Sequence, residues 1–119
     1  MTKHYLIVCD RPPYGSVGVQ ESLDMATAAA AFDLTVKVLL RGDAVYAAVA
    51  AQATDALGQR NLGKYLRALG IYGVAGIFVS TADLAERGLS ESELVADVDP
   101  LAPSEIDVLM TAGYLVVQL

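Results

Sequence analysis

Cysteine and histidine are nearly absent from this chain, which holds one of each among 119 residues. A single cysteine cannot build a disulfide framework, and it cannot provide the several thiolates of a multi-cysteine metal site. Nothing resembles a Ser/His/Asp or Cys/His catalytic arrangement around the only histidine, His4. We therefore expect no metal and no cofactor, and the scarcity of cysteine favours a reducing cytoplasm.

Long hydrophobic runs are also absent, although 55% of the residues are hydrophobic. No run approaches the ~20 residues that a membrane span requires, and no basic segment precedes a signal-like apolar stretch. With 18% charged residues the chain is too apolar to be disordered. We expect a cytoplasmic protein without a membrane segment, whose excess apolar surface is buried in the fold or against other subunits.

Basic residues are scarce in the second half of the chain. Residues 1–67 hold seven Lys/Arg and six Asp/Glu, a net charge of +1, whereas residues 68–119 hold one Arg and eight acids, a net charge of −7. Binding to nucleic acid requires clustered cations that release counterions from phosphates. Direct contact with nucleic acid is therefore not expected.

Five short apolar runs alternate with helical patterns. The runs predict strands at residues 4–9, 34–40, 74–79, 94–98 and 114–119, with the first as a central strand. Helices are expected from Ser16 to Asp33 and over residues 58–69, 82–87 and 103–112, while residues 44–53 fit a helix or a packed loop. This alternation predicts a single three-layer α/β/α domain over residues 1–119, with a five-stranded, mostly parallel sheet.

The first loop lies where α/β domains usually bind ligands, at the carboxyl end of a strand. We expect four of its residues to face this crevice: Cys9, Asp10, Tyr14 and Ser16. Low-molecular-weight phosphatases and arsenate reductases place a nucleophilic cysteine in the same way, but they need an arginine six residues later. Gly15 occupies that position here. Packing of Cys9 as a small apolar side chain is the simpler interpretation.

Other candidate sites are equally incomplete. Gly15 and Gly18 match neither the G-x-G-x-x-G nor the Walker pattern, so they fit a turn and a helix entry. Four acids lie near predicted strand ends without a histidine beside them, as expected for helix starts: Asp10, Asp43, Asp83 and Asp99. His4 begins the first strand, at the edge opposite the crevice, and is expected to be structural or solvated.

Four segments together resemble the DsrE/DsrF/DsrH family. They are PPYGS at residues 12–16, LLRGDAVY at 39–46, LGIY at 69–72 and LAERGL at 84–89. Bacterial relatives in this family, TusB, TusC and TusD, form a sulfur-relay complex. The short length, the first loop and the AERGL segment most resemble the DsrF/TusC subunit.

The resemblance bears directly on sulfur chemistry. In the DsrE/TusD subunit the cysteine that carries the persulfide ends the third strand, and the residue at that position here is Ser80. A hydroxyl cannot form a persulfide, so the carrier role does not transfer. Ala44 also departs from the glycine that relatives tend to have in a G-D-G-V motif, whereas Tyr46 is retained.

The resemblance implies a non-catalytic structural subunit of a cytoplasmic heterohexamer, with two copies each of DsrE/TusD-like, DsrH/TusB-like and this type of chain. The sulfur would go to 2-thiouridine at the tRNA wobble position or through intracellular sulfur oxidation. We expect the family motifs to shape partner contacts through Pro13, Tyr14, Gly15, Ser16, Arg41, Asp43, Tyr46, Ser80, Arg87 and Gly88. Two alternatives remain open: Cys9 accepts sulfane sulfur itself, or the Gly15/Gly18 crevice binds a small molecule.

Overall fold

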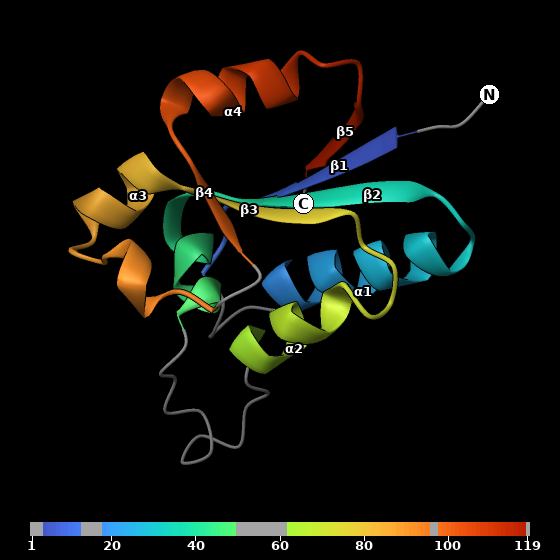
Figure 1. Cartoon of the computed structure of the whole chain (residues 1–119), viewed down its shortest axis with the longest axis horizontal. Helices are drawn as coiled ribbons and strands as arrows, with labels where there is room; N and C mark the ends of the chain where they lie inside the picture. The colour runs from blue at the N-terminus through green and yellow to red at the C-terminus, as the bar shows by residue number, and fades with distance from the viewer. Residues whose placement is uncertain (1–3, 13–17, 50–61, 96–97, 119) are drawn as a thin grey trace.

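The computed structural model describes residues 4–12, 18–49, 62–95 and 98–118. Strands and helices alternate along the chain (Figure 1). The strands are β1 (His4–Cys9), β2 (Thr35–Leu40), β3 (Gly76–Ser80), β4 (Asp99–Leu101) and β5 (Leu115–Gln118). The α-helices are α1 (Gly18–Ala31), α2 (Leu62–Leu69), α3 (Thr81–Glu86) and α4 (Pro103–Met110), with 3-10 helices η1 (Gly42–Ala48) and η3 (Glu91–Glu93).

The five strands form one sheet in the order β4-β3-β2-β1-β5, and every neighbouring pair is parallel. The prediction of a five-stranded, mostly parallel sheet is confirmed. The middle strand is β2, so the expectation that the first strand is the central one is wrong, although β1 pairs on both sides. Parallel neighbours require crossover connections, which the intervening helices provide.

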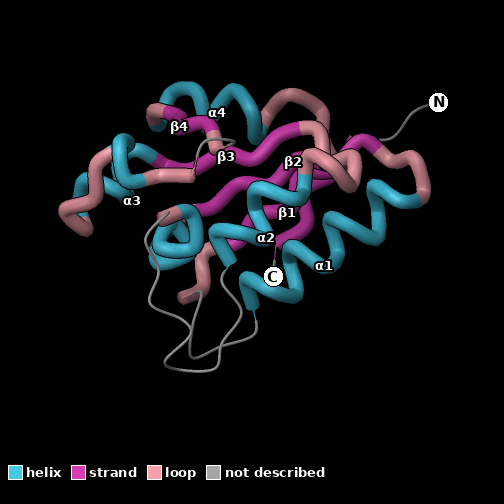
Figure 2. The backbone as a smooth tube through the Cα atoms, turned by 60° about the horizontal axis from the view of Figure 1, so that its bottom comes forward, coloured by secondary structure: helices cyan, strands magenta, loops and turns pink. Residues whose placement is uncertain are grey.

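Helices cover the two faces of the sheet unequally. In Figures 1 and 2, α1 and α2 lie on one face, whereas α4 covers the other. The face under α1, α2 and η1 carries the larger apolar core, built around residues such as Ile7, Val38 and Val79. The buried part of the core under α4 consists of Leu6, Val8, Leu39 and Ile106. The three-layer α/β/α architecture is therefore as predicted, with one thin outer layer.

Helix α1 has the apolar face that its sequence predicts. Val19, Leu23 and Ala26 are fully buried at helical spacing, and Ala30 is half-buried on the same side. Small side chains let this helix lie close to the sheet. The chain leaves the helix through Asp33, whose φ of 62° lies in the left-handed region.

The fourth strand is the clearest correction. We expected it at residues 94–98, but β4 is Asp99–Leu101. The backbone N–H of Val95 instead donates to the Ala48 carbonyl at 2.8 Å, and Leu94 forms an antiparallel bridge with Val49. Val95 and Val98 are buried and Leu94 is partly buried, but the backbone here pairs with the end of η1 and with Val49, and not with β3.

Two other predicted segments are only partly described. Residues 44–53 begin within the 3-10 helix η1, and residues 50–61 lie outside the described residues. The helix expected over residues 58–69 is described from Leu62 onward. No helix in the described ranges is long and apolar enough to cross a membrane.

Candidate functional site

The candidate site lies at the carboxyl edge of the sheet, where all five parallel strands end. Four predicted site residues, Pro13, Tyr14, Gly15 and Ser16, lie outside the described residues. The remaining ones follow two neighbouring strands. Arg41, Asp43 and Tyr46 follow β2, and Ser80, Arg87 and Gly88 end or follow β3. The family segments at residues 39–46 and 84–89 are therefore side by side, although about 40 residues separate them in the sequence.

Cys9 does not face this edge. Its side chain is 0% exposed and belongs to the core beneath α1 and η1. The expectation that Cys9 faces a crevice is therefore wrong, and its interpretation as a small packed side chain is supported. At the edge itself, the residue contributes only its carbonyl oxygen, which accepts a hydrogen bond from the Arg41 N–H at 2.8 Å.

Ser80 is buried and caps a helix. It is 4% exposed, and its hydroxyl accepts a hydrogen bond from the backbone N–H of Asp83 at 3.2 Å, at the start of α3. This satisfies one of the free donors at a helix start. Since side chains alternate along a strand, and Cys9 is in register with Leu40 and Val79, Cys9 and Ser80 lie on opposite faces of the sheet.

Arg87 connects the segments that follow β2 and β3. Its Nε and Nη2 each lie 3.0 Å from Oδ1 of Asp43, and its Nη1 donates to the backbone carbonyl of Asp83 at 3.0 Å. The guanidinium suits this position because its planar fork offers several donors at once. The hydrogen bond to Asp43 raises the pKa of Arg87 above its ordinary value.

Gly42 holds the same connection through its backbone. Its N–H donates to Oδ2 of Asp83 at 2.8 Å. Its φ is +54°, and a Cβ at this position would lie 3.2 Å from the carbonyl oxygen of Asp10. Only glycine fits this turn without strain. Gly42 was not among the predicted site residues. Its hydrogen bond to Asp83 could not be predicted, because no sequence motif links residues 41 positions apart.

Asp10 closes the other side of the edge. Its Oδ2 accepts a hydrogen bond from Nε2 of Gln118 at 2.8 Å, which joins the loop after β1 to β5. The guanidinium of Arg41 approaches the same oxygen only to 3.9 Å. Asp10 therefore lies at the edge as predicted, but it binds a neighbouring side chain.

The other predicted polar residues do not complete a catalytic group. Asp99 begins β4 and so lies at the opposite end of a strand from the one expected. His4 contacts the ring of Tyr114 edge-on, with centroids 5.8 Å apart. Within the described ranges, no three His, Cys, Asp or Glu side chains come together as a metal site. The arrangement described here fixes turns and helix ends, which suits a surface of defined shape.

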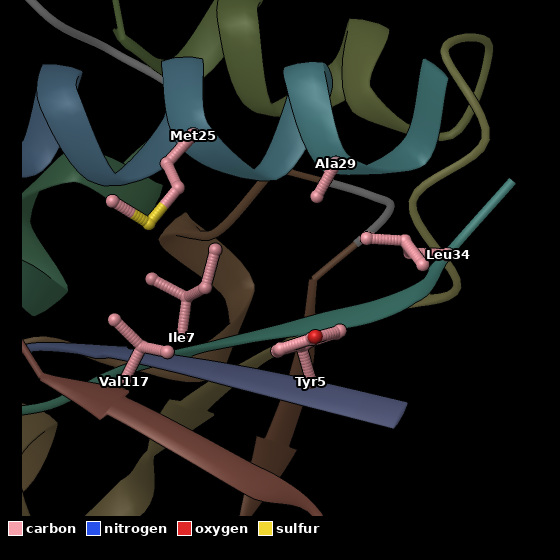
Figure 3. Close-up of a pocket in the computed structure, with 6 residues that line it drawn as sticks. All are labelled: Tyr5, Ile7, Met25, Ala29, Leu34 and Val117. Carbon is pink, nitrogen blue, oxygen red and sulfur yellow. The ribbon is translucent and has the colours of Figure 1, made fainter. Parts of the chain in front are cut away.

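Apolar side chains remain open to solvent outside this edge. Figure 3 shows a hollow of about 260 Å³ between α1 and the strands β1 and β5. Met25, which lines the hollow, is 41% exposed, and Leu115 at the start of β5 is 49% exposed. The hollow is lined by Tyr5, Ile7, Met25, Ala29, Leu34 and Val117.

Fold and edge together define an α/β protein with an all-parallel sheet, in which paired turns after β2 and β3 form a rigid carboxyl edge. Residues 3–119 match the DsrE/DsrF-like family. The chain belongs to this family, which confirms the resemblance drawn from the four sequence segments.

Several relatives are similar over most of the chain. A TusC homolog from Pseudomonas aeruginosa is 36% identical over 101 residues, 85% of each chain. The intracellular sulfur oxidation protein DsrF from Allochromatium vinosum is 35% identical over 95 residues, 80% of this chain and 70% of the relative. A TusC homolog from Vibrio parahaemolyticus is 30% identical over 104 residues, 87% of this chain and 88% of the relative.

Solved structures show the same fold. The YchN protein from E. coli superimposes with a TM-score of 0.85 at 24% identity, covering 99% of this chain and all of that protein. A protein of unknown function from Methanobacterium thermoautotrophicum gives a TM-score of 0.73 at 12% identity, with both chains fully covered. At these identities the similarity concerns the fold alone.

Proposed function

We propose that this chain is a non-catalytic structural subunit of a sulfur-relay complex. In this proposal it assembles with DsrE/TusD-like and DsrH/TusB-like chains, two copies of each, in the cytoplasm. It supports the persulfide-carrying cysteine of a partner and carries no sulfur itself. The names TusC homolog and DsrF among its relatives support a role in sulfur transfer.

The observation that carries the proposal is the placement of the only thiol. Cys9 is fully buried, and a persulfide forms on a thiolate that a sulfur donor can reach. Ser80, which stands where the family resemblance places the carrier cysteine, uses its hydroxyl to cap α3. Neither residue offers an accessible sulfur nucleophile.

The apolar surface supports assembly with other chains. Contiguous exposed apolar patches on a small protein mark contacts with partners. In the part of the chain that the structure describes, the large apolar side chains that remain exposed are Met25, Phe32, Tyr46, Ile71, Tyr72, Val108, Leu115 and Val116. Tyr46, which follows the turn after β2, belongs to the family motif that we expected to face a partner.

Co-expression with the cognate DsrE-like and DsrH-like chains tests the proposal. We expect the three chains to co-elute as one complex, and the complex to accept sulfur on a partner cysteine and none on this chain. A chain that stays alone during gel filtration in the presence of both partners contradicts the assignment. Sulfite-reductase genes beside its gene indicate sulfur oxidation, and their absence favours tRNA thiolation.

A further inference from the structure

The face of the sheet beneath α4 is only partly covered. A single helix of eight residues packs there, and Figure 1 shows it alone on that side of the sheet. A hollow of about 360 Å³ remains between α4 and the sheet. Its lining residues are Phe78, Leu101, Glu105, Val108, Leu109, Ala112 and Tyr114. Val108 on α4 is 68% exposed at this hollow.

Lys37 does not line this hollow, but its ammonium group lies beside two aromatic rings that do. It lies in β2 on the same face as Leu39, because side chains alternate along the strand. Its ammonium group lies 5.1 Å from the ring centroid of Tyr114 and 5.8 Å from that of Phe78. Both rings line the hollow, so the positive charge lies beside an apolar space.

The charge of Lys37 is only partly compensated. In the described part of the chain, no carboxylate lies within 4.0 Å of its ammonium group. Glu105, the acid that lines the hollow, accepts a hydrogen bond from the N–H of Ala102 and caps α4. Aromatic rings attract a cation, but a half-buried ammonium gains more from a carboxylate.

We propose that this surface, which we call the Lys37 hollow, docks a partner protein chain that presents a large apolar side chain beside a carboxylate. The apolar side chain fills the space between Phe78, Val108 and Tyr114, and the carboxylate pairs with Lys37. Charge complementarity selects the occupant, because the Lys37 ammonium beside the apolar space has no carboxylate within 4.0 Å among the described residues. The inference rests on the proposed function, in which the partner is another subunit of the relay complex.

The test measures the affinity of purified variants for the cognate DsrE-like and DsrH-like chains. Val108→Asp puts a charge into the apolar space, and Lys37→Glu reverses the charge beside it. We expect each to weaken binding by about tenfold or more. Lys37→Met retains the apolar stem, so it should weaken binding less and reduce its dependence on salt between about 0.05 and 0.5 M.

Ala28→Asp is the matched control, because Ala28 on α1 is exposed, does not line the hollow and is not one of the large exposed apolar side chains. It should bind as the unchanged chain does, and thermal unfolding checks that all variants are folded. If the unchanged chain binds its partners and the hollow variants bind equally well, the docking surface is wrong and the proposed function stands. If the unchanged chain binds neither partner, the proposed function itself fails. Dimerisation of the chain alone, abolished by Val108→Asp, would overturn the choice of occupant.

Discussion

Gly42 and Asp83 are joined by a hydrogen bond of 2.8 Å between a backbone N–H and a carboxylate oxygen, although 41 residues separate them. The bond connects the turn after β2 to helix α3 after β3. Arg87 connects the same two segments from the other side through Asp43. The segments at residues 39–46 and 84–89 therefore belong to one structural unit in this chain.

Replacement of Gly42 by alanine tests this unit through the backbone. The added Cβ would meet the Asp10 carbonyl oxygen at 3.2 Å, and the φ of +54° is unfavourable for alanine. We expect Gly42→Ala to lower the free energy of unfolding by about 1–3 kcal/mol, as measured by urea denaturation. Gly70→Ala is the control, because a Cβ there has no neighbour within 4 Å. Equal losses in both variants would contradict the role of Gly42.

Replacement of Arg87 tests the same unit through its side chain. Arg87→Lys keeps the charge but cannot contact Asp43 and the Asp83 carbonyl with one planar group. We expect faster hydrogen exchange of the amides in η1, with Arg87→Lys nearly as affected as Arg87→Met. Arg41→Lys should change little, because Arg41 approaches Asp10 only to 3.9 Å. If the η1 amides of Arg87→Lys exchange as slowly as in the unchanged chain, a positive charge at this position is enough to hold the two segments together.

The positions of helices and strands were easier to predict from the sequence than the segments with which each strand pairs. Apolar patterns gave β1 and α1, because the strand buries one continuous run and the helix one recognisable stripe. They misplaced the fourth strand, because Val95 and Val98 are buried and Leu94 is partly buried, as apolar residues of a strand would be. The true strand contains Pro100, which is tolerated because β4 is an edge strand.

In the candidate site too, the location was predictable from the sequence but the long-range contacts were not. The carboxyl edge was predictable, since parallel strands end together and polar residues follow each one. The contacts of Arg87 with Asp43 were not, because 44 residues separate the two and no local pattern links them. Burial of Cys9 was predicted from residue statistics, but its face of the sheet follows only from the strand register.

Replacement of Ser80 tests whether its hydroxyl is structural. Ser80→Ala removes the acceptor for the N–H of Asp83 and leaves that donor to solvent or without a partner. We expect a loss of about 1 kcal/mol in the free energy of unfolding. Ser104→Ala in the exposed first turn of α4 is the control and should stay within about 0.5 kcal/mol of the unchanged chain. If Ser80→Ala is as stable as Ser104→Ala, the Ser80 hydroxyl does not stabilise the start of α3.

Exposure of Cys9 to a persulfide donor tests the sulfur-acceptor alternative. The thiol is 0% exposed, so a donor can reach it only after the surrounding core opens. We expect the folded chain to gain no sulfur atom by mass spectrometry, and the chain unfolded in urea to react. We also expect a relay complex built with Cys9→Ala to transfer sulfur at the unchanged rate, because this thiol takes no part in the transfer.

A second cysteine variant shows that the donor is effective. Ala82 is exposed in the first turn of α3, close to Ser80 in the chain, and Ala82→Cys in a Cys9→Ala background supplies an accessible thiol. This variant should gain sulfur in the folded state, because exposure lets the thiolate form and react. An adduct on Cys9 in the folded chain at a rate like that of the Ala82 variant would establish Cys9 as an acceptor and remove the structural-subunit proposal. If Cys9 gains no sulfur under conditions in which the Ala82→Cys variant does, the result supports a partner's cysteine as the sulfur carrier.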